Sequence, residues 1–411
     1  MATQAGEALQ PENRGAISAS ALDRWLLRTM MGALPRAGYE VVLWDGSSAG
    51  DKTGLRVRIR DRAALRQLVR NPSLHFGDLY SAGRIEVEGD LVTFLERTYA
   101  ALDAGRAADA SAWWKVWTIP APHSSSTEAA RDNIHQHYDL GNDFYALWLD
   151  RGAMQYTCAY FPEPGMSLEA AQRAKMDHIC RKLRLRSGQR VYEAGCGWGG
   201  FALHMAREYG VEVRAWNISR EQVRLATERA RKEGLASRVA FVEDDYRNIR
   251  GECDAFVSVG MLEHVGAENY GELGAVIGRC LAPRGMGLIH TIGRNRPEPM
   301  NGWIERRIFP GAQPPSLGEM MAIFEPGGFS VLDVENLRLH YAETLRHWMA
   351  RYLEVMDDVR AARGAEFARA WHLYLAGSTA AFTTGCMQLF QVLFARVGNN
   401  DLPATRRHLY R

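Results

Sequence analysis

The spacing of apolar residues separates a mixed N-terminal region from the rest of the chain. Apolar and basic residues alternate over 55–60, which is the period of a half-buried strand. Helical patterns lie on either side of this strand, over 21–34 and over 62–70. This mixture predicts a small α+β domain over residues 21–103.

The pattern after residue 130 is different. Short apolar runs, several of them ending in glycine, alternate with amphipathic helical segments between about 190 and 293. Such alternation predicts a doubly wound, mostly parallel sheet, and we assign the α/β domain to residues 131–411. Small residues, prolines and serines over 104–130 predict a linker, and the polar residues 1–20 predict a disordered tail.

One uncharged stretch could be either a membrane-spanning helix or a buried core element. Residues 370–395 contain no Asp, Glu, Lys or Arg, as a membrane-spanning helix would. However, histidine, serine, threonine and glutamine side chains interrupt the stretch, and a helix surrounded by lipid tolerates them poorly. We therefore predict a buried core element here.

Composition narrows the classes of function. Fifty basic residues against 48 acidic ones give a net charge of +2, which argues against a nucleic-acid partner bound by bulk charge. The six cysteines are scattered without CxxC pairs, so we predict neither a disulfide framework nor a metal site. The polar N-terminus lacks a secretory signal, and these features together favour a cytoplasmic protein.

The strongest local motif is the glycine-rich loop E-A-G-C-G-W-G-G over 193–200, between an expected strand and an expected helix. Glycines let the backbone approach a ligand closely at the carboxyl ends of the strands. The loop is similar to the E-x-G-x-G loop of class I methyltransferases that use S-adenosylmethionine (SAM), in which Glu193 would orient the amino group of the cofactor. Asn217 and Gln222 follow the next strand as candidate ribose or adenine partners, and Tyr246 follows the third as a candidate stacking partner.

Several further motifs, taken in order, resemble the cyclopropane fatty acid synthase family, which includes the mycolic acid cyclopropane synthases. The matching segments are H-Q-H-Y-D-L-G-N-D-F-Y (135–145), Q-Y-T-C-A-Y-F (155–161), G-C-G-W-G-G (195–200), G-M-L-E-H-V-G (260–266), H-T-I-G (290–293) and I-F-P-G (308–311). The resemblance runs from about residue 131 to the C-terminus. The N-terminal region resembles, more weakly, the extra domain of the full-length phospholipid-acting synthases.

The resemblance implies a reaction and a site. A methylene group would pass from SAM to the double bond of an unsaturated phospholipid acyl chain, through a carbocation that a bound bicarbonate deprotonates. The residues implied to hold the bicarbonate are Cys158, Glu263, His290 and Tyr341, with the backbone of Ile292. The residues implied to bind SAM are Tyr156, Thr157, Glu193, Gly195, Gly197, Asn217, Gln222, Tyr246 and Arg247.

Two residues depart from the family pattern and leave the required groups in place. Ser378 stands where relatives usually have a cysteine, and Asn217 replaces the usual threonine. The motifs do not separate a cyclopropane product from a methyl or methylene branch, so that alternative stays open. A small-molecule N-methyltransferase is a further alternative, and the complete set of implied bicarbonate residues counts against it. A non-catalytic lipid-binding protein is another, and the intact glycine loop and Glu263 count against that one.

The lipid contacts are also expectations at this point. We expect 370–395 together with Phe144, Tyr145 and Trp148 to form the walls of an acyl tunnel, although core packing would explain them equally well. The cations and apolar residues of 294–309 suit an anionic phospholipid surface, or else form a solvated loop. The tryptophans at 113–117 would either dock the linker or touch a membrane. The family suggests a homodimer that associates peripherally with the membrane.

Overall fold

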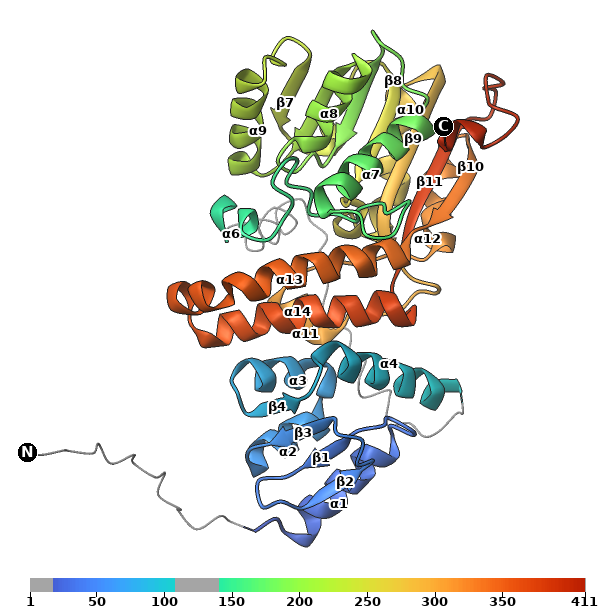
Figure 1. The fold of residues 1–411 in the computed structure, drawn as a ribbon. Coiled ribbons are helices and arrows are strands. Elements are labelled where there is room, and N and C mark those ends of the chain that lie inside the picture. The colour runs from blue at the N-terminus through green and yellow to red at the C-terminus, as the bar shows by residue number, and fades with distance from the viewer. Residues whose placement is uncertain (1–17, 108–139, 411) are drawn as a thin grey trace, which may run out of the picture.

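The computed structural model describes residues 18–107 and 140–410, which form a smaller N-terminal domain and a larger α/β domain (Figure 1). The N-terminal domain has a four-stranded sheet in the order β2-β1-β3-β4, in which only β1 and β3 run parallel. Its elements are α1 (Ala21–Gly32), β1 (Glu40–Val42), β2 (Ser48–Gly50), β3 (Arg56–Ile59), α2 (Arg62–Arg70), α3 (Pro72–Ser81), β4 (Ile85–Glu88) and α4 (Leu91–Ala107).

The alternation in 55–60 is confirmed as the two faces of β3. Val57 and Ile59 are buried, whereas Arg58 points away and pairs with Glu88 on β4 at 2.7 Å. The predicted limits of this domain need correction at both ends. Ser20 caps α1 with its side chain, so residues 18–20 belong to the folded domain, and α4 continues to Ala107, inside the expected linker.

The α/β domain has a seven-stranded sheet in the order β10-β11-β9-β8-β5-β6-β7, with β11 antiparallel to both neighbours. Its strands are β5 (Arg190–Ala194), β6 (Glu212–Asn217), β7 (Val239–Glu243), β8 (Cys253–Val259), β9 (Leu281–Gly293), β10 (Phe329–Asn336) and β11 (Gln388–Arg396). Its helices are α6 (Asn142–Ala146), α7 (Leu168–Lys182), α8 (Gly200–Tyr209), α9 (Arg220–Lys232), α10 (Tyr270–Cys280), α11 (Gly302–Arg307), α12 (Leu317–Phe324), α13 (Arg338–Arg363) and α14 (Ala365–Thr384). The predicted doubly wound sheet is thereby confirmed.

Successive residues of the central strands enter two different cores. Val191 on β5 packs in a cluster with residues of α7 and α8, whereas its neighbour Tyr192 packs with α10 and α12 on the other face. This follows from the two-residue period of a strand, because both faces of a parallel sheet are covered by helices. The same alternation points Glu193 toward the face that α7 covers.

The uncharged stretch 370–395 is confirmed as part of the core, but it is two elements. α14 ends at Thr384, Gly385 adopts a left-handed conformation with φ 84°, and β11 begins at Gln388 and lies between β10 and β9 in the large sheet. No helix within residues 18–107 and 140–410 combines the length and the apolarity that crossing a bilayer requires.

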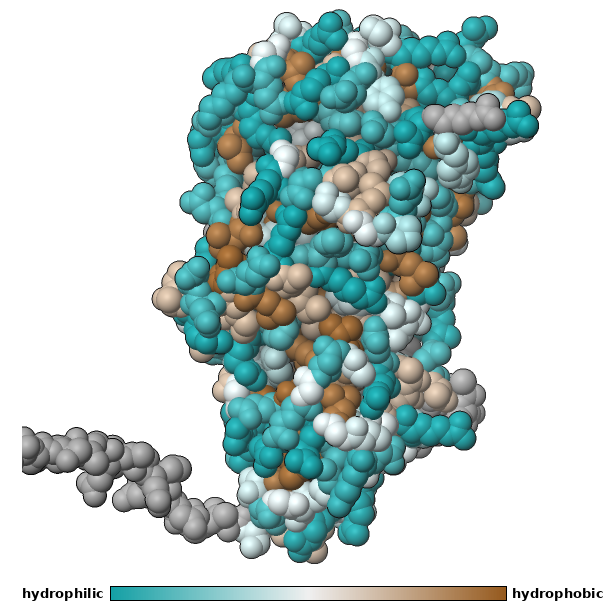
Figure 2. All heavy atoms as spheres, in the orientation of Figure 1, coloured by the Kyte–Doolittle hydropathy of each residue, from teal (hydrophilic) through white to brown (hydrophobic). Residues whose placement is uncertain are grey.

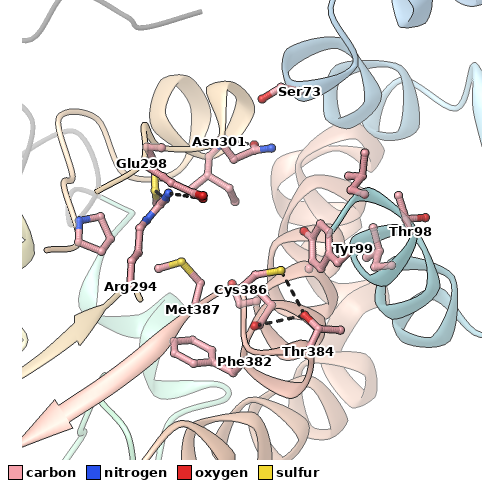
Figure 3. Close-up of a pocket in the computed structure, with 18 of the residues that line it drawn as sticks. Ser73, Thr98, Tyr99, Arg294, Glu298, Asn301, Phe382, Thr384, Cys386 and Met387 are labelled. Atoms are coloured by element: carbon pink, nitrogen blue, oxygen red, sulfur yellow. Dashed lines mark hydrogen bonds and ion pairs between the residues drawn. The ribbon is translucent and has the colours of Figure 1, made fainter. Parts of the chain in front are cut away.

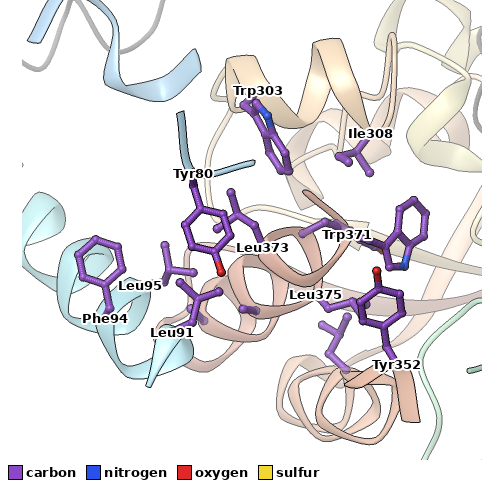
Figure 4. Close-up of a cluster of buried hydrophobic side chains, with 14 of the residues drawn as sticks. Tyr80, Leu91, Phe94, Leu95, Trp303, Ile308, Tyr352, Trp371, Leu373 and Leu375 are labelled. Atoms are coloured by element: carbon purple, nitrogen blue, oxygen red, sulfur yellow. The ribbon is translucent and has the colours of Figure 1, made fainter. Parts of the chain in front are cut away.

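The α13–α14 hairpin lies between the large sheet and the N-terminal domain (Figure 1). Tyr80, Leu91 and Leu95 of the small domain meet Leu373 and other residues of α14 in one apolar cluster (Figure 4). Arg369 on α14 donates to the carbonyl oxygen of Tyr80 at 2.7 Å. The two domains therefore share a packed interface.

At Gly77, helix α3 of the small domain lies directly against α11, and a side chain at this position is expected to disrupt the interface. A Cβ atom at Gly77 would lie 2.3 Å from the buried ring of Trp303 on α11. We expect Gly77→Val to destabilise the protein by about 1–3 kcal/mol, because α3 and α11 would have to separate. Urea unfolding measures this change. Gly32→Val is the matched control, since a Cβ at Gly32 meets no atom within 4 Å. An equal loss in both variants would contradict the prediction.

Candidate functional site

Three neighbouring parallel strands, β5, β8 and β9, carry the candidate residues at their carboxyl ends. The glycine loop follows β5, the short 3₁₀ helix η3 (Leu262–His264) follows β8, and His290 lies near the end of β9. The loop and η3 are in contact, because a Cβ atom at Gly195 would lie 2.8 Å from the Cβ of Met261. The sheet therefore brings the expected cofactor loop beside the segment that contains Glu263.

The glycine loop is pressed against other backbone. Gly195 has a φ of 83°, in the region that glycine adopts without strain. Gly200 is the first residue of α8 and lies against the backbone of Ala153. A Cβ atom at Gly200 would be 2.1 Å from the carbonyl oxygen of Ala153. Both positions require glycine, which keeps the loop close enough to the strands for a ligand to contact its backbone.

Glu193 is buried at the end of β5, and its Oε2 has no hydrogen-bond partner within the described part of the chain. Burial raises the pKa of Glu193 to about 8, and the nearby charge of Lys175 opposes this rise. Lys175, on α7, is also buried; it donates to Thr157 Oγ1 at 3.0 Å and to Gln155. An unpaired buried carboxyl group beside a glycine loop fits the amino group of SAM.

Asn217 and Gln222 hold the loop in addition to flanking it. Asn217 Nδ2 donates to the carbonyl oxygen of Gly197 at 3.2 Å and to Gln222 Oε1 at 2.7 Å, and its Oδ1 accepts from the amide of Ser219. Both the nitrogen and the oxygen of the Asn217 side-chain amide have hydrogen-bond partners within the protein. In this structure the side chain therefore holds the loop, and its hydrogen bond to the cofactor stays a prediction. Gln222 Nε2, in contrast, has no partner among the described residues.

Tyr246 and Arg247 lie in the 3₁₀ helix η2 (Tyr246–Asn248), after β7. The Arg247 guanidinium stacks over the Tyr246 ring at 4.8 Å and pairs with Asp245 and Glu272, each at 3.0 Å. The ring is thus supported on one side by a cation. Arg247 is engaged by two carboxylates, so it acts here as a support for Tyr246.

A cavity of about 1450 Å³ extends from this edge of the sheet toward the N-terminal domain (Figure 3). All five residues implied to form the bicarbonate site line it, and so do Tyr156 and Thr157. The bicarbonate set consists of Cys158, Glu263, His290, Ile292 and Tyr341. These residues come from four separate parts of the chain, and only the fold brings them to one wall.

Glu263 is held in one orientation at this wall. Its Oε1 accepts a hydrogen bond of 2.6 Å from the amide of Ile292, and its Oε2 has no partner in the described structure. Burial raises the pKa of Glu263 to about 7, so near neutral pH about half of the molecules present a protonated carboxyl group. The backbone of Ile292 was expected to contribute to the bicarbonate site, and its amide holds Glu263 in place there.

His290 is oriented by a residue on the adjacent strand. Its Nδ1 lies 3.1 Å from Nε2 of Gln391, which is directly opposite on β11. Burial lowers the pKa of His290 well below its usual value, so the ring is neutral. An amide donor at Nδ1 leaves the hydrogen on Nε2, which is buried and has no partner among residues 18–107 and 140–410.

Gln391 is therefore expected to act as a positioning residue. Gln391→Glu keeps the size but replaces the amide donor by a carboxylate acceptor, which moves the imidazole hydrogen to Nδ1. We expect about a 10-fold loss of activity and a change of the His290 tautomer. Nitrogen chemical shifts of selectively labelled histidine measure the tautomer. Unchanged shifts in an inactive variant would indicate a purely structural role.

Cys158 and Tyr341 complete the wall. The Cys158 thiol is buried and donates to the carbonyl oxygen of Ala159 at 3.0 Å, and burial raises its pKa, so it is a neutral thiol. The Tyr341 ring, on α13, lies 4.5 Å from the Phe382 ring on α14. Ser378 also lines the cavity.

One expectation about lipid contacts is corrected. Phe144, Tyr145 and Trp148 do not line the cavity; they form a buried aromatic cluster with Trp371 behind its wall. Within 294–309, Trp303 and Ile308 are buried against the N-terminal domain and α14, whereas Arg296 and Arg306 are exposed, and contact of this segment with a phospholipid surface stays a prediction. Arg307 pairs with Asp78 of the small domain at 3.0 Å.

Sequence reasoning missed Lys175, Gln391 and the contribution of the N-terminal domain to the cavity. A lysine within an otherwise helical pattern gives no signal of burial, and Gln391 is 101 residues away from its partner. The tryptophans at 113–117 and the first part of the 135–145 motif lie outside the described residues.

The surface over the two domains is mixed, with apolar side chains gathered near the α13–α14 layer (Figure 2). Among these, Leu339 and Leu353 on α13 are exposed. Neither residue belongs to the cavity. The expected homodimer stays a prediction.

Comparison with known proteins identifies close similarities. The family model for mycolic acid cyclopropane synthetase matches residues 125–392, and a model for a domain of unknown function matches 26–105. The chain is 36% identical to a probable fatty acid methyltransferase of Pseudomonas putida, over 90% of this chain and 95% of the relative. It is 34% identical to the cyclopropane-fatty-acyl-phospholipid synthase of Escherichia coli K12, over 93% and 97%.

Among solved structures, a mycolic acid cyclopropane synthase complexed with SAH and CTAB superimposes with a TM-score of 0.61 and 29% identity. The match covers 64% of this chain and 97% of that one. The class I methyltransferase fold expected from the glycine loop is confirmed.

Proposed function

We propose, from the premise that this chain belongs to the mycolic acid cyclopropane synthetase family, that it converts double bonds of phospholipid acyl chains into cyclopropane rings. The protein is a SAM-dependent methyltransferase of the cyclopropane synthase type. One observation carries the finer proposal: Glu263 and His290 line one largely apolar cavity, and the cofactor loop contacts Met261, two residues before Glu263. The name of the Escherichia coli relative supports a phospholipid acceptor.

The acceptor must be held away from water. In the proposed reaction the π electrons of the alkene take the methyl carbon of SAM, and the carbon–sulfur bond breaks. A cation remains on the neighbouring alkene carbon, and ring closure then requires loss of one proton from the added methyl. Aromatic side chains on the cavity wall, including Tyr341, Phe382 and Phe309, supply electron-rich faces to the cation and exclude water.

The residues present fit a small bound anion such as bicarbonate. Glu263 Oε2 and His290 Nε2 are both buried and lack partners within the described structure. When Glu263 is protonated and His290 is neutral, each of these atoms carries a hydrogen and can donate it to the anion. When bound, bicarbonate would supply the base that accepts the proton of the added methyl. Glu263 and His290 would bind it as hydrogen-bond donors, and Glu263 in its ionised form, accessible at a pKa of about 7, would take over the proton, while Ile292 and Gln391 keep the two side chains in place.

A methyl- or methylene-branched product is the second candidate. The Pseudomonas putida relative is named a probable fatty acid methyltransferase, and its match covers 90% of the chain, against 93% for the cyclopropane synthase. The branch would arise from the same cation by loss of a proton from the acyl chain instead of the added methyl. We favour the ring because the buried donors of Glu263 and His290 suit an anion that acts as base at this wall.

The test is to incubate the protein with SAM and vesicles of monounsaturated phospholipid and to record proton NMR spectra of the extracted lipids. Strongly upfield cyclopropane protons are the expected result. Methyl or vinylidene signals instead would replace the ring by the branched product. No change in the lipids, while SAM still binds, would reject acyl chains as the acceptor. Contact with the membrane surface is part of the proposal, and vesicle co-sedimentation measures it.

A further inference from the structure

The cavity does not stop at the domain interface, because buried residues of the N-terminal domain also line it. We call the part formed by Met30, Leu34, Val41, Val57, Leu68 and Phe94 the chamber. These residues come from α1 and the turn that follows it, the neighbouring strands β1 and β3, α2 and α4, and each is at least nine-tenths buried. The core of the small domain is therefore hollow on the side from which the cavity enters.

The chamber is chemically uniform. Its six side chains are apolar, and the neighbouring Tyr39 hydroxyl is satisfied by Thr98 Oγ1 at 3.2 Å. Cavities with such linings stay free of water and take apolar ligands. Protein cores are otherwise close-packed, and a small domain gives up many dispersion contacts when its core stays open. A ligand that fills the chamber would restore these contacts.

The path from the chamber to Glu263 passes α14 and the segment that follows β9. Tyr99 on α4 points toward Thr384 and Cys386 across this passage (Figure 3). Tyr99 also lies close to α14, because a Cβ atom at Gly377 would be 3.6 Å from the Tyr99 hydroxyl, in ordinary van der Waals contact. The polar groups Arg294, Glu298 and Asn301 lie on its other side (Figure 3).

We propose that the N-terminal domain binds an acyl chain of the lipid substrate in the chamber and thereby sets the chain length that the enzyme accepts. This inference rests on the proposed function. An unbranched hydrocarbon chain matches the apolar lining and the continuous connection to the reacting wall. Two parts of one phospholipid have this chemistry: the methyl end of the reacting chain, and the companion chain on the same glycerol.

Photo-crosslinking of the full chain locates the acyl chain. The probes are monounsaturated phospholipids with a diazirine at the end of either the reacting chain or the companion chain, presented in vesicles with SAM. Label in peptides from residues 21–107 is the expected result, and the probe that produces it identifies the chain. Label from both probes confined to residues 140–410 would overturn the inference. Cyclopropane formation in the same vesicles tests the proposed function separately.

Filling the chamber tests its role in selecting chain length. Val57→Phe adds a ring to the lining, and Ile59→Phe is the matched control, because Ile59 is buried on the same strand but does not line the cavity. With acyl chains of 14 to 20 carbons (about the range of membrane lipids), we expect Val57→Phe to lower the ratio of long-chain to short-chain turnover about 10-fold. Its Tm should stay at or above that of the wild type, whereas Ile59→Phe should lower Tm and leave the ratio unchanged.

A second variant keeps the test decisive if Val57→Phe does not fold. Leu34→Ala enlarges the chamber and should raise the long-chain to short-chain ratio. Ratios equal to that of the wild type in whichever of the two variants fold would overturn the inference, even if the wild type forms the cyclopropane product.

Discussion

Replacing Glu263 by glutamine is expected to lower product formation by about 10²- to 10⁴-fold while SAM binding persists. The amide oxygen can still accept the hydrogen bond from Ile292, so the side chain keeps its place. The amide cannot release or take up a proton, however, and the path by which the proton leaves the site is lost. Product yield by NMR and SAM affinity by calorimetry measure the two effects separately.

The pH dependence gives this prediction a second, independent readout. Burial raises the pKa of Glu263 to about 7, and the protonated carboxyl is the form that donates to an anion. Wild-type activity should therefore fall as pH rises through about 7, and the residual activity of Glu263→Gln should lack that fall. Glu268→Gln is the control, because Glu268 is an exposed carboxylate five residues away. A Glu263→Gln variant with more than half of the wild-type activity would exclude proton transfer at this side chain.

Glu193→Gln is expected to weaken SAM binding by about 10- to 100-fold, the effect of losing a charge-assisted hydrogen bond of about 1.5–3 kcal/mol. Glu193 has a buried Oε2 without a partner in the described structure, so a cationic amino group is the missing partner we infer. Glu212→Gln is the matched control, since Glu212 is exposed at the start of β6. Equal affinities in the two variants would remove Glu193 from the cofactor site.

Binding of SAM should also release protons. In the free protein burial raises the pKa of Glu193 to about 8, so most molecules carry a proton there at pH 7. A bound cation favours the ionised carboxylate and lowers that pKa, which expels the proton. SAM affinity should thus increase from pH 7 to pH 8. Calorimetry in two buffers with different ionisation enthalpies counts the protons, and the count should approach zero in Glu193→Gln.

The fold class and the identities of the implied site residues were readable from the sequence because they depend on local patterns. Strand periodicity predicted β3 and the parallel strands, and the glycine loop predicted the turn between β5 and α8. Motifs that keep their spacing identified Glu263 and His290 individually. Each of these features is contained in a short segment, so its signal does not require knowledge of what lies opposite.

Other features depended on contacts between distant segments. The partner of His290 is Gln391 because the antiparallel pairing of β9 and β11 places them opposite each other. Phe144, Tyr145 and Trp148 were assigned to the tunnel because composition cannot distinguish a cavity wall from the packed layer behind it. Only the positions of the neighbouring helices make that distinction.

The sequence by itself determined the parallel strands β5 to β9 and, through its resemblance to known motifs, the use of SAM and the family to which the chain belongs. The tertiary structure alone decided that Lys175 is buried near Glu193, that Trp303 and Ile308 are buried against the N-terminal domain and α14, and that the N-terminal core opens into the cavity that Glu263 and His290 line. The physical reason is that hydrophobic patterns report which side chains leave water. They do not report whether those side chains pack against one another or surround an empty space.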